Sequence, residues 1–228
     1  IRDSIGIERS KVSGNLWFTA EYFTGVTVSG QSGNWIHNYG IFSNDAGPEF
    51  HEVGDEKYFI LLSTGYDFAE QMDADHMIIR LDYVHNKESE NLGTKKLENV
   101  VSVVAKYDKE NLHIHGDLTF GQGFDGGDIT GFVLMPFYDL SDTFQLVARF
   151  THLSSDKNNM LGLGRYERDL VSAKGDKLQE LFLGLNTYFY GHKLKWQNGI
   201  QFTSMDDDAN DGGEYSGVGF TSALRMSW

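Results

Sequence analysis

The sequence predicts an all-β protein, a transmembrane antiparallel up-and-down β-barrel of the outer-membrane type, and three observations predict it. The last strand alternates with a period of two, so that apolar side chains share one face and hydroxyls, glycines and Arg225 share the other. Eleven such segments follow one another, many of them ten residues or longer, and about 9–11 residues are needed to cross a bilayer on a tilt. The connections alternate between short and long, as in barrels with tight periplasmic turns and longer extracellular loops.

The eleven alternating segments begin at Gly25 and continue to the end of the chain. They are Gly25–Gly30, Asn34–Phe42, Lys57–Phe68, His76–His85, Leu97–Tyr107, Asn111–Gly121, Asp128–Tyr138, Thr143–Leu153, Leu178–Tyr190, His192–Ser204 and Tyr215–Trp228. Short connections follow the odd-numbered segments, and the longer ones follow the even-numbered segments at 43–56, 86–96, 122–127, 154–177 and 205–214. Greek-key crossings do not produce this strict alternation. The seventh segment is the least regular, because both of its faces are apolar and Pro136 interrupts its ladder.

The two faces of each segment differ in polarity. In the tenth segment Leu194, Trp196, Ile200 and Phe202 alternate with Lys193, Lys195, Gln197, Gln201 and Thr203. The fourth, sixth and eighth segments divide in the same way. A dry protein core would not hold these charges without partners, and a lipid-facing surface would tolerate them less. The sequence therefore predicts that the apolar face meets lipid and that the polar face lines a water-filled lumen.

Composition narrows the class of protein. The chain has 228 residues, of which 40% are hydrophobic, its mean hydropathy is −0.38, and it contains no apolar run of 18 residues that would suggest a membrane helix. The absence of cysteine removes disulfide scaffolds and cysteine-based zinc sites. A formal net charge of −14 argues against a nucleic-acid partner. We expect no cofactor and no resident metal. The pair His113 and His115 and the oxygen-rich stretch Asp206–Glu214 are the two alternatives for a metal site.

The strand count has a consequence for the N-terminal residues. Eleven is odd, whereas bacterial single-chain barrels contain even numbers of strands. Residues 1–24 do not alternate, and the order of the rims places them in an extracellular loop ahead of the first segment. If the complete barrel has sixteen strands, this loop is its third extracellular loop, which folds inward in general porins. We therefore expect residues 1–228 to form one barrel domain whose first strands lie upstream.

Several stretches resemble the phosphate-selective porin family, the porins of O and P type. They are ERSKVSGNLWFTAEYFTGVTVSG at Glu8–Gly30, NYGIFSND at Asn38–Asp45, YGHKLKWQNGIQFT at Tyr190–Thr203, and the terminal strand. The resemblance covers the whole chain and corresponds to the C-terminal part of a family member. It implies a sixteen-stranded, usually trimeric channel in the outer membrane of a Gram-negative bacterium, in contact with lipid and lipopolysaccharide. It implies no catalytic residue.

Some members of that family bind phosphate through inward arginines and lysines, and this chain offers eight candidates for guiding anions. They are Arg9 and Lys11 in the predicted constriction loop, and Arg80, Lys106, Arg149, Lys193, Lys195 and Arg225 at inward positions. Closely spaced cations can replace the hydration that a phosphate loses in a narrow pore. Alternatively, these side chains only wet the lumen and pair with Asp82, Asp117 and Glu180.

The function predicted from the sequence is passive diffusion of small solutes, notably anions such as phosphate. One alternative is an outer-membrane barrel enzyme of the lipase or protease type, which needs a His within hydrogen-bond reach of both a Ser and an acid. Another alternative is a soluble β-sandwich binding module, which needs two packed sheets and a dry interior. The contacts that the inner-face side chains make distinguish these hypotheses.

Overall fold

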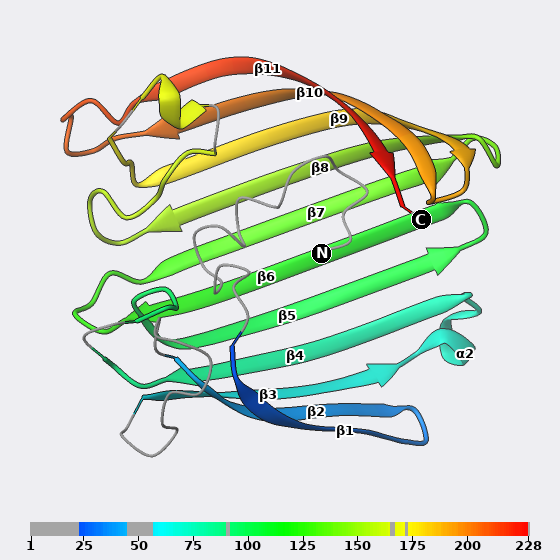
Figure 1. Ribbon diagram of the computed structural model, residues 1–228, viewed down its shortest axis with the longest axis horizontal. Coiled ribbons are helices and arrows are strands. Elements are labelled where there is room, and N and C mark those ends of the chain that lie inside the picture. The colour runs from blue at the N-terminus through cyan, green and yellow to red at the C-terminus, as the bar shows by residue number, and fades with distance from the viewer. Residues whose placement is uncertain (1–22, 45–56, 90–91, 165–166, 172, 228) are drawn as a thin grey trace.

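The computed structural model describes residues 23–44, 57–89, 92–164, 167–171 and 173–227. These residues form one antiparallel sheet of eleven strands, in which every strand pairs with its neighbours in the sequence (Figure 1). The first strand, β1 (Gly25–Ser32), and the last, β11 (Tyr215–Met226), are the two edges of this sheet. The prediction of an up-and-down antiparallel all-β sheet is confirmed, and the sheet order contains no Greek-key crossing of the kind a sandwich would show.

The predicted segments match the observed strands to within a residue or two at each end. Between β1 and β11 the strands are β2 (Trp35–Ser43), β3 (Tyr58–Asp67), β4 (His76–Asn86), β5 (Leu97–Lys109), β6 (Leu112–Gly123), β7 (Ile129–Asp139), β8 (Phe144–Ser155), β9 (Lys177–Tyr190) and β10 (Leu194–Asp206). A four-residue helix, α2 (Ala69–Met72), fills the turn between β3 and β4, and a 3-10 turn, η1 (Glu167–Asp169), lies between β8 and β9. In the described part of the chain, no helix is long and apolar enough to cross a membrane.

Short turns and long loops lie on opposite rims of the sheet, at the right and left of Figure 1. Two of the short turns are two-residue hairpins, and their first residues, Gly33 and Glu110, have φ values of 57° and 50°. Left-handed φ values are those that tight hairpins require. The predicted inward loop at residues 1–24 lies almost wholly outside the described residues.

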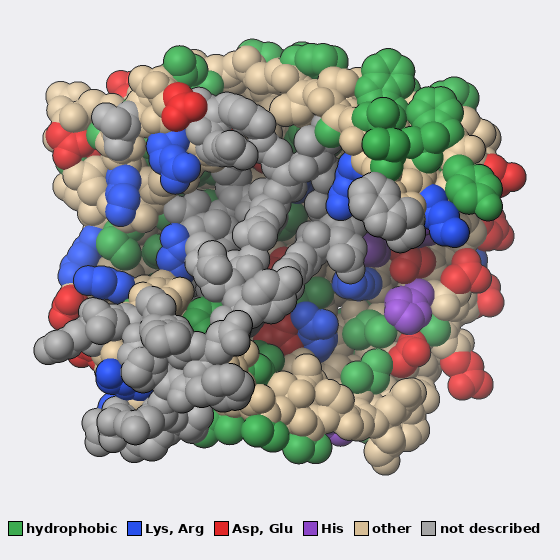
Figure 2. Space-filling view, in the orientation of Figure 1, with side chains coloured by type: hydrophobic (Ala, Val, Ile, Leu, Met, Phe, Trp, Pro, Cys, Tyr) green, Lys and Arg blue, Asp and Glu red, His purple; other side chains and the backbone are tan. Residues whose placement is uncertain are grey.

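The polarity of the two faces is the reverse of that in a soluble sheet. On β10 the apolar side chains Trp196, Ile200 and Phe202 are 45%, 37% and 42% exposed, whereas Gln197 and Gln201 on the opposite face are 1% and 6% exposed. Figure 2 shows apolar side chains gathered along its upper and lower margins, over the two ends of the strand order, with charged groups at the rims between them. We call the apolar exposed side the outer face and the buried side the inner face.

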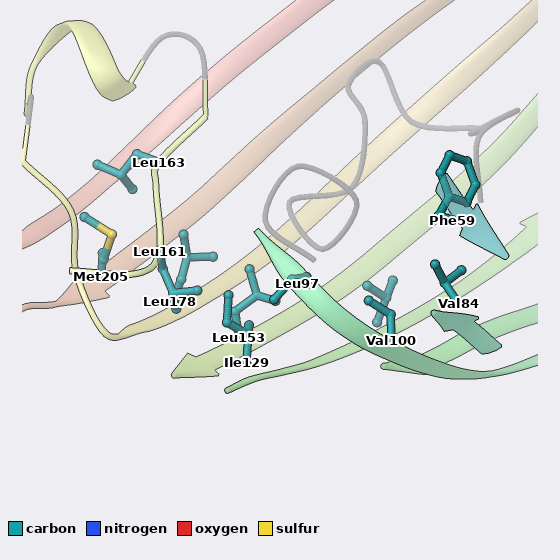
Figure 3. Close-up of a cluster of buried hydrophobic side chains, with 11 residues drawn as sticks. Phe59, Val84, Leu97, Val100, Ile129, Leu153, Leu161, Leu163, Leu178 and Met205 are labelled. Carbon is teal, nitrogen blue, oxygen red and sulfur yellow. The ribbon is translucent and has the colours of Figure 1, made fainter. Parts of the chain in front are cut away.

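The inner face also contains apolar clusters, which differ from the prediction of a uniformly polar lining. At the long-loop rim a cluster gathers residues of β3 to β5 and β7 to β10 with Leu161 and Leu163 of the β8–β9 loop (Figure 3). Further along the strands, Met135 and Phe137 of β7 pack with Val147 and Phe182. The second cluster agrees with the apolar character of the seventh segment, whose pairing with β8 is interrupted beside Pro136.

Candidate functional site on the inner face

Five of the eight predicted anion-guiding residues lie at inner-face positions of the strands. They are Arg80 on β4, Lys106 on β5, Arg149 on β8, Lys195 on β10 and Arg225 on β11. Arg9 and Lys11 lie outside the described residues. Lys193 is exposed and belongs to the turn before β10, because the strand begins at Leu194 and its register shifts there. Side chains alternate between the two faces only within a strand, and Lys193 precedes the first residue of β10, so the alternation does not fix its direction.

Arg80 is paired with an acid on its own strand. Its Nε and Nη2 donate to Oδ2 of Asp82 at 3.0 and 2.8 Å, and Ser63 donates to Oδ1 of Asp82 at 2.6 Å. The Arg80 side chain remains 43% exposed, so this pair contributes little to stability. Its electrostatic effect is to cancel the positive charge of Arg80 on the inner face.

Arg149 is buried and paired across two strands. Its Nη2 donates to Oε1 of Glu180 at 2.8 Å, and the two side chains are 3% and 0% exposed. The guanidinium carbon lies 5.2 Å from the ring centroid of Phe182. The alternative that the inward cations pair with Asp82 and Glu180 therefore holds for Arg80 and Arg149. Asp117 behaves differently, since it accepts hydrogen bonds from Ser102 and Thr119 at 2.6 and 2.7 Å.

Lys195 and Arg225 form the least neutralised cationic pair. They are direct register partners on β10 and β11, so both side chains project from the same face. Lys195 is only 5% exposed, and its Nζ lies 5.7 Å from the ring centroid of Tyr188. Among the described residues no carboxylate forms an ion pair with either side chain. Arg225 is exposed, whereas Lys195 is buried. Because a buried cation without a counter-ion is costly, Lys195 together with the neighbouring Arg225 can attract an anion from solution.

A chain of polar side chains crosses the inner face near the short-turn rim, and the sequence reasoning missed most of it. His113 contacts Asp108 and Asp139, Asp139 accepts from Gln145, Gln145 accepts from Asn186, and Asn186 accepts from Gln197. The sequence placed His113 and Gln197 on the polar face but did not connect them. The available signal for the two carboxylates was that Asp108 and Asp139 directly follow the predicted fifth and seventh segments.

The long-loop rim has its own contacts with the inner face. The β8–β9 loop brings Glu167 onto β10, where Gln201 Nε2 donates to Glu167 Oε1 at 2.6 Å. The base of the same loop is held by Asp176, which is 2% exposed and accepts backbone N–H groups of Asn159 and Asp208 at 2.7 Å each. Two long loops are thus tied together above the inner face.

The acidic stretch Asp206–Glu214 forms a turn around one carboxylate. The carboxylate of Asp207 accepts backbone N–H groups from Ala209, Asp211, Gly212 and Gly213 at 2.8 to 3.1 Å. The N–H of Gly213, followed by those of the other residues, lowers the pKa of Asp207 below its ordinary value. Within the described ranges no three potential ligands are grouped so that they could hold a metal ion.

The described histidines make contacts of several kinds. His37 contacts Tyr39 and Thr64, His85 contacts Asn99, and His113 contacts two carboxylates. In the described part of the chain no histidine hydrogen-bonds both a Ser and an acid.

The inner face can therefore solvate polar solutes, and its Lys195–Arg225 pair can favour anions, through side chains held in place by neighbouring strands. These properties follow from the geometry of the chain itself. Comparisons with protein-family models and with curated proteins find no match to this chain.

Proposed function

We propose that this chain is part of an outer-membrane diffusion channel whose inner face lines a water-filled lumen for small solutes, anions such as phosphate among them. The observation that carries the proposal is the reversed polarity of the sheet. Its exposed side is apolar, and its buried side holds charged and amide side chains connected by hydrogen bonds.

The outer face supports the membrane part of the proposal. Apolar side chains more than one-third exposed recur on strand after strand, for example Leu118 and Phe120 on β6, Leu146 and Phe150 on β8, and Ile200 on β10. Soluble monomers rarely expose a contiguous apolar patch larger than a few hundred Å². In a lipid bilayer these apolar side chains would contact acyl chains instead of water. A sheet can span lipid once its edges are closed.

The edges support a barrel with more strands than these eleven. β1 and β11 run in the same direction, since ten antiparallel pairings separate them. An all-antiparallel closure therefore needs an odd number of additional strands between them, and five would give sixteen. This number, membership of the phosphate-selective porin family, a homotrimeric state, contacts with lipopolysaccharide and a Gram-negative outer-membrane location rest on the sequence resemblance described above.

The charges on the inner face support a preference for anions over cations. The acids beside Arg80 and Arg149 neutralise those arginines, which leaves Lys195 and Arg225 as the adjacent cations without an acid partner among the described residues. Lysine and arginine can replace water around a phosphate during passage. Formal charge over the whole chain is −14, but charges beyond about 10 Å are screened at moderate salt.

The test is a planar-bilayer recording of the purified protein. We expect stepwise conductance, a reversal potential in a KCl gradient that favours chloride, and a reduced chloride current when phosphate is added. A cation-selective current unaffected by phosphate would remove the anion preference and leave the channel. Release of the protein from membranes without detergent, with no conductance, would remove the channel itself.

A further inference from the structure

His113 lies between two carboxylates on the inner face near the short-turn rim. Its Nδ1 is 2.7 Å from Oδ1 of Asp108 on β5, and its Nε2 is 3.1 Å from Oδ2 of Asp139 on β7. An ionised carboxylate only accepts hydrogen bonds, and a neutral imidazole carries a single N–H. Both contacts are therefore hydrogen bonds only when His113 is an imidazolium.

The surroundings of His113 favour a cation at this position. The ring of Phe137 stacks on the imidazole, with ring centroids 4.5 Å apart and an interplanar angle of 7°, and an aromatic face attracts a cation. His115 contacts the same oxygen of Asp108 through Nε2 at 3.2 Å.

Other titratable groups around this site come from β4, β5 and β9, where Tyr188 donates to Oε1 of Gln145 at 2.9 Å. On β5, Lys106 is the register partner of His115, and on β4, His76 is the register partner of Asp108. From β8, the uncharged Gln145 approaches Asp139. Two carboxylates contact His113 directly, whereas this neighbourhood contains a single lysine, Lys106, so the charge around His113 is net negative.

Asp139 is also the end of a directional chain of amides. Gln145 Nε2 donates to Asp139 Oδ1 at 2.7 Å, Asn186 donates to Gln145 Oε1 at 2.9 Å, and Gln197 donates to Asn186 Oδ1 at 3.0 Å. Every amide in the chain points its N–H groups toward Asp139. This arrangement holds one oxygen of the carboxylate in place and leaves the other for His113.

We propose that His113 is a proton-binding site that sets the charge of the channel mouth at the short-turn rim. With a proton on both ring nitrogens, His113 bridges and partly neutralises Asp108 and Asp139. When one proton leaves to water, one of the two hydrogen bonds is lost and a carboxylate is released toward the lumen. The net charge of the three groups changes from −1 to −2, so anions pass less easily at higher pH. This inference rests on the proposed channel function.

The first test compares the anion-to-cation permeability ratio at pH 5 and pH 8 in planar bilayers. One unit of charge a few Å from a permeating ion in water changes the energies of an anion and of a cation by about 1 kcal/mol each, in opposite directions, so the ratio should fall by up to about thirtyfold as the pH rises. His113→Gln should remove most of this fall and hold the ratio near its high-pH value. His37→Gln is the matched control, because His37 lies on the outer face, in register with Thr64, and should leave the fall unchanged. Retention of the full pH effect in His113→Gln would overturn the proposal.

The second test does not need conductance. In detergent micelles, ¹⁵N-labelled histidine should show both ring N–H groups of His113 hydrogen-bonded at pH 5, and one of them should disappear by pH 8. Asp139→Asn should weaken only the hydrogen bond at Nε2, and Asp108→Asn only that at Nδ1. If the protein fails to conduct but these signals appear, the channel is wrong and the proton site stands. If it conducts and His113 shows no titration between pH 5 and 8, the proton site is wrong and the channel stands.

Discussion

The guanidinium of Arg149 on β8 donates to the carboxylate of Glu180 on β9 at 2.8 Å, and both side chains are almost completely buried on the inner face of the sheet. Phe182 lies two residues further along β9 and places its ring beside the same guanidinium. A buried ion pair on a sheet whose opposite face is apolar and exposed combines the two features on which the proposed channel function rests.

Removing one member of this pair should strongly destabilise the fold. Glu180→Gln removes the carboxylate charge that faces Nη2 of Arg149, and losing one partner of a buried pair costs about 3–5 kcal/mol. Urea unfolding in detergent micelles measures this loss. The double variant Arg149→Met, Glu180→Leu removes both charges and should recover most of the stability. Equal losses in the single and double variants would contradict the account.

The Lys195–Arg225 pair should determine much of the ionic preference. Lys195→Gln and Arg225→Gln should each lower the anion-to-cation permeability ratio by up to about thirtyfold, since each removes one charge that lowers the energy of an anion and raises that of a cation by about 1 kcal/mol. Reversal potentials in a KCl gradient measure this ratio. Lys193→Gln is the control, because this lysine lies in the turn before β10 and not at an inner-face position of a strand, and it should change the ratio less. A larger effect of Lys193→Gln would place the selective site elsewhere.

An arginine should lower the free energy of unfolding more on the outer face than on the inner face. Ile200→Arg places a guanidinium midway along β10 on the apolar face, where a charge costs about 2–4 kcal/mol at the centre of a bilayer. Thr221→Arg, on the neighbouring strand and the inner face, should cost much less. The free energy of unfolding in lipid bilayers compares the two. If the sheet were soluble, Ile200→Arg would be the better tolerated, because Ile200 is exposed.

Two glycines make room for the ring that supports Arg149. A Cβ at Gly199 would overlap the ring of Phe182, and a Cβ at Gly184 would lie 2.7 Å from the same ring. Gly199→Val should therefore displace Phe182 and cost about 1–3 kcal/mol, as overpacking does. Gly219, the register neighbour of Gln201 on β11, has open space at its Cβ, so Gly219→Val should be nearly neutral by thermal unfolding.

The turn at Asp207 should open in acid. Hydrogen bonds from Gly213 and three other backbone N–H groups lower the pKa of Asp207 below its ordinary value of 3.8. A lowered folded-state pKa means that the stabilisation is present above the ordinary value and is lost as the pH falls through the lowered one. The protection factors of the Gly212 and Gly213 amides, which compare their exchange with the intrinsic rate at the same pH, should fall at low pH, and Asp207→Ala should show low protection even at pH 6. In Asp206→Asn, the control, exchange should follow the unmodified protein.

The sequence by itself determined the strands, the order of short and long connections, and the polarity of each face. These features follow from local periodicity, because side chains on a strand alternate between faces whatever the neighbouring strands do. The predicted sides of Trp196, Gln197 and Arg149 were therefore right. Lys193 was placed wrongly because local alternation does not show where a strand begins beside a turn.

Only the tertiary structure decided which inner side chains meet. Arg149 and Glu180 are 31 residues apart, and His113 and Asp139 are 26 apart, so their contact depends on the register between neighbouring strands. That register is set by turn geometry and by the stagger of the sheet, neither of which is contained in the alternation of one segment. The apolar cluster under Leu161 and Leu163 was equally hidden, because it forms only when a long loop folds back onto strands that are distant in the chain.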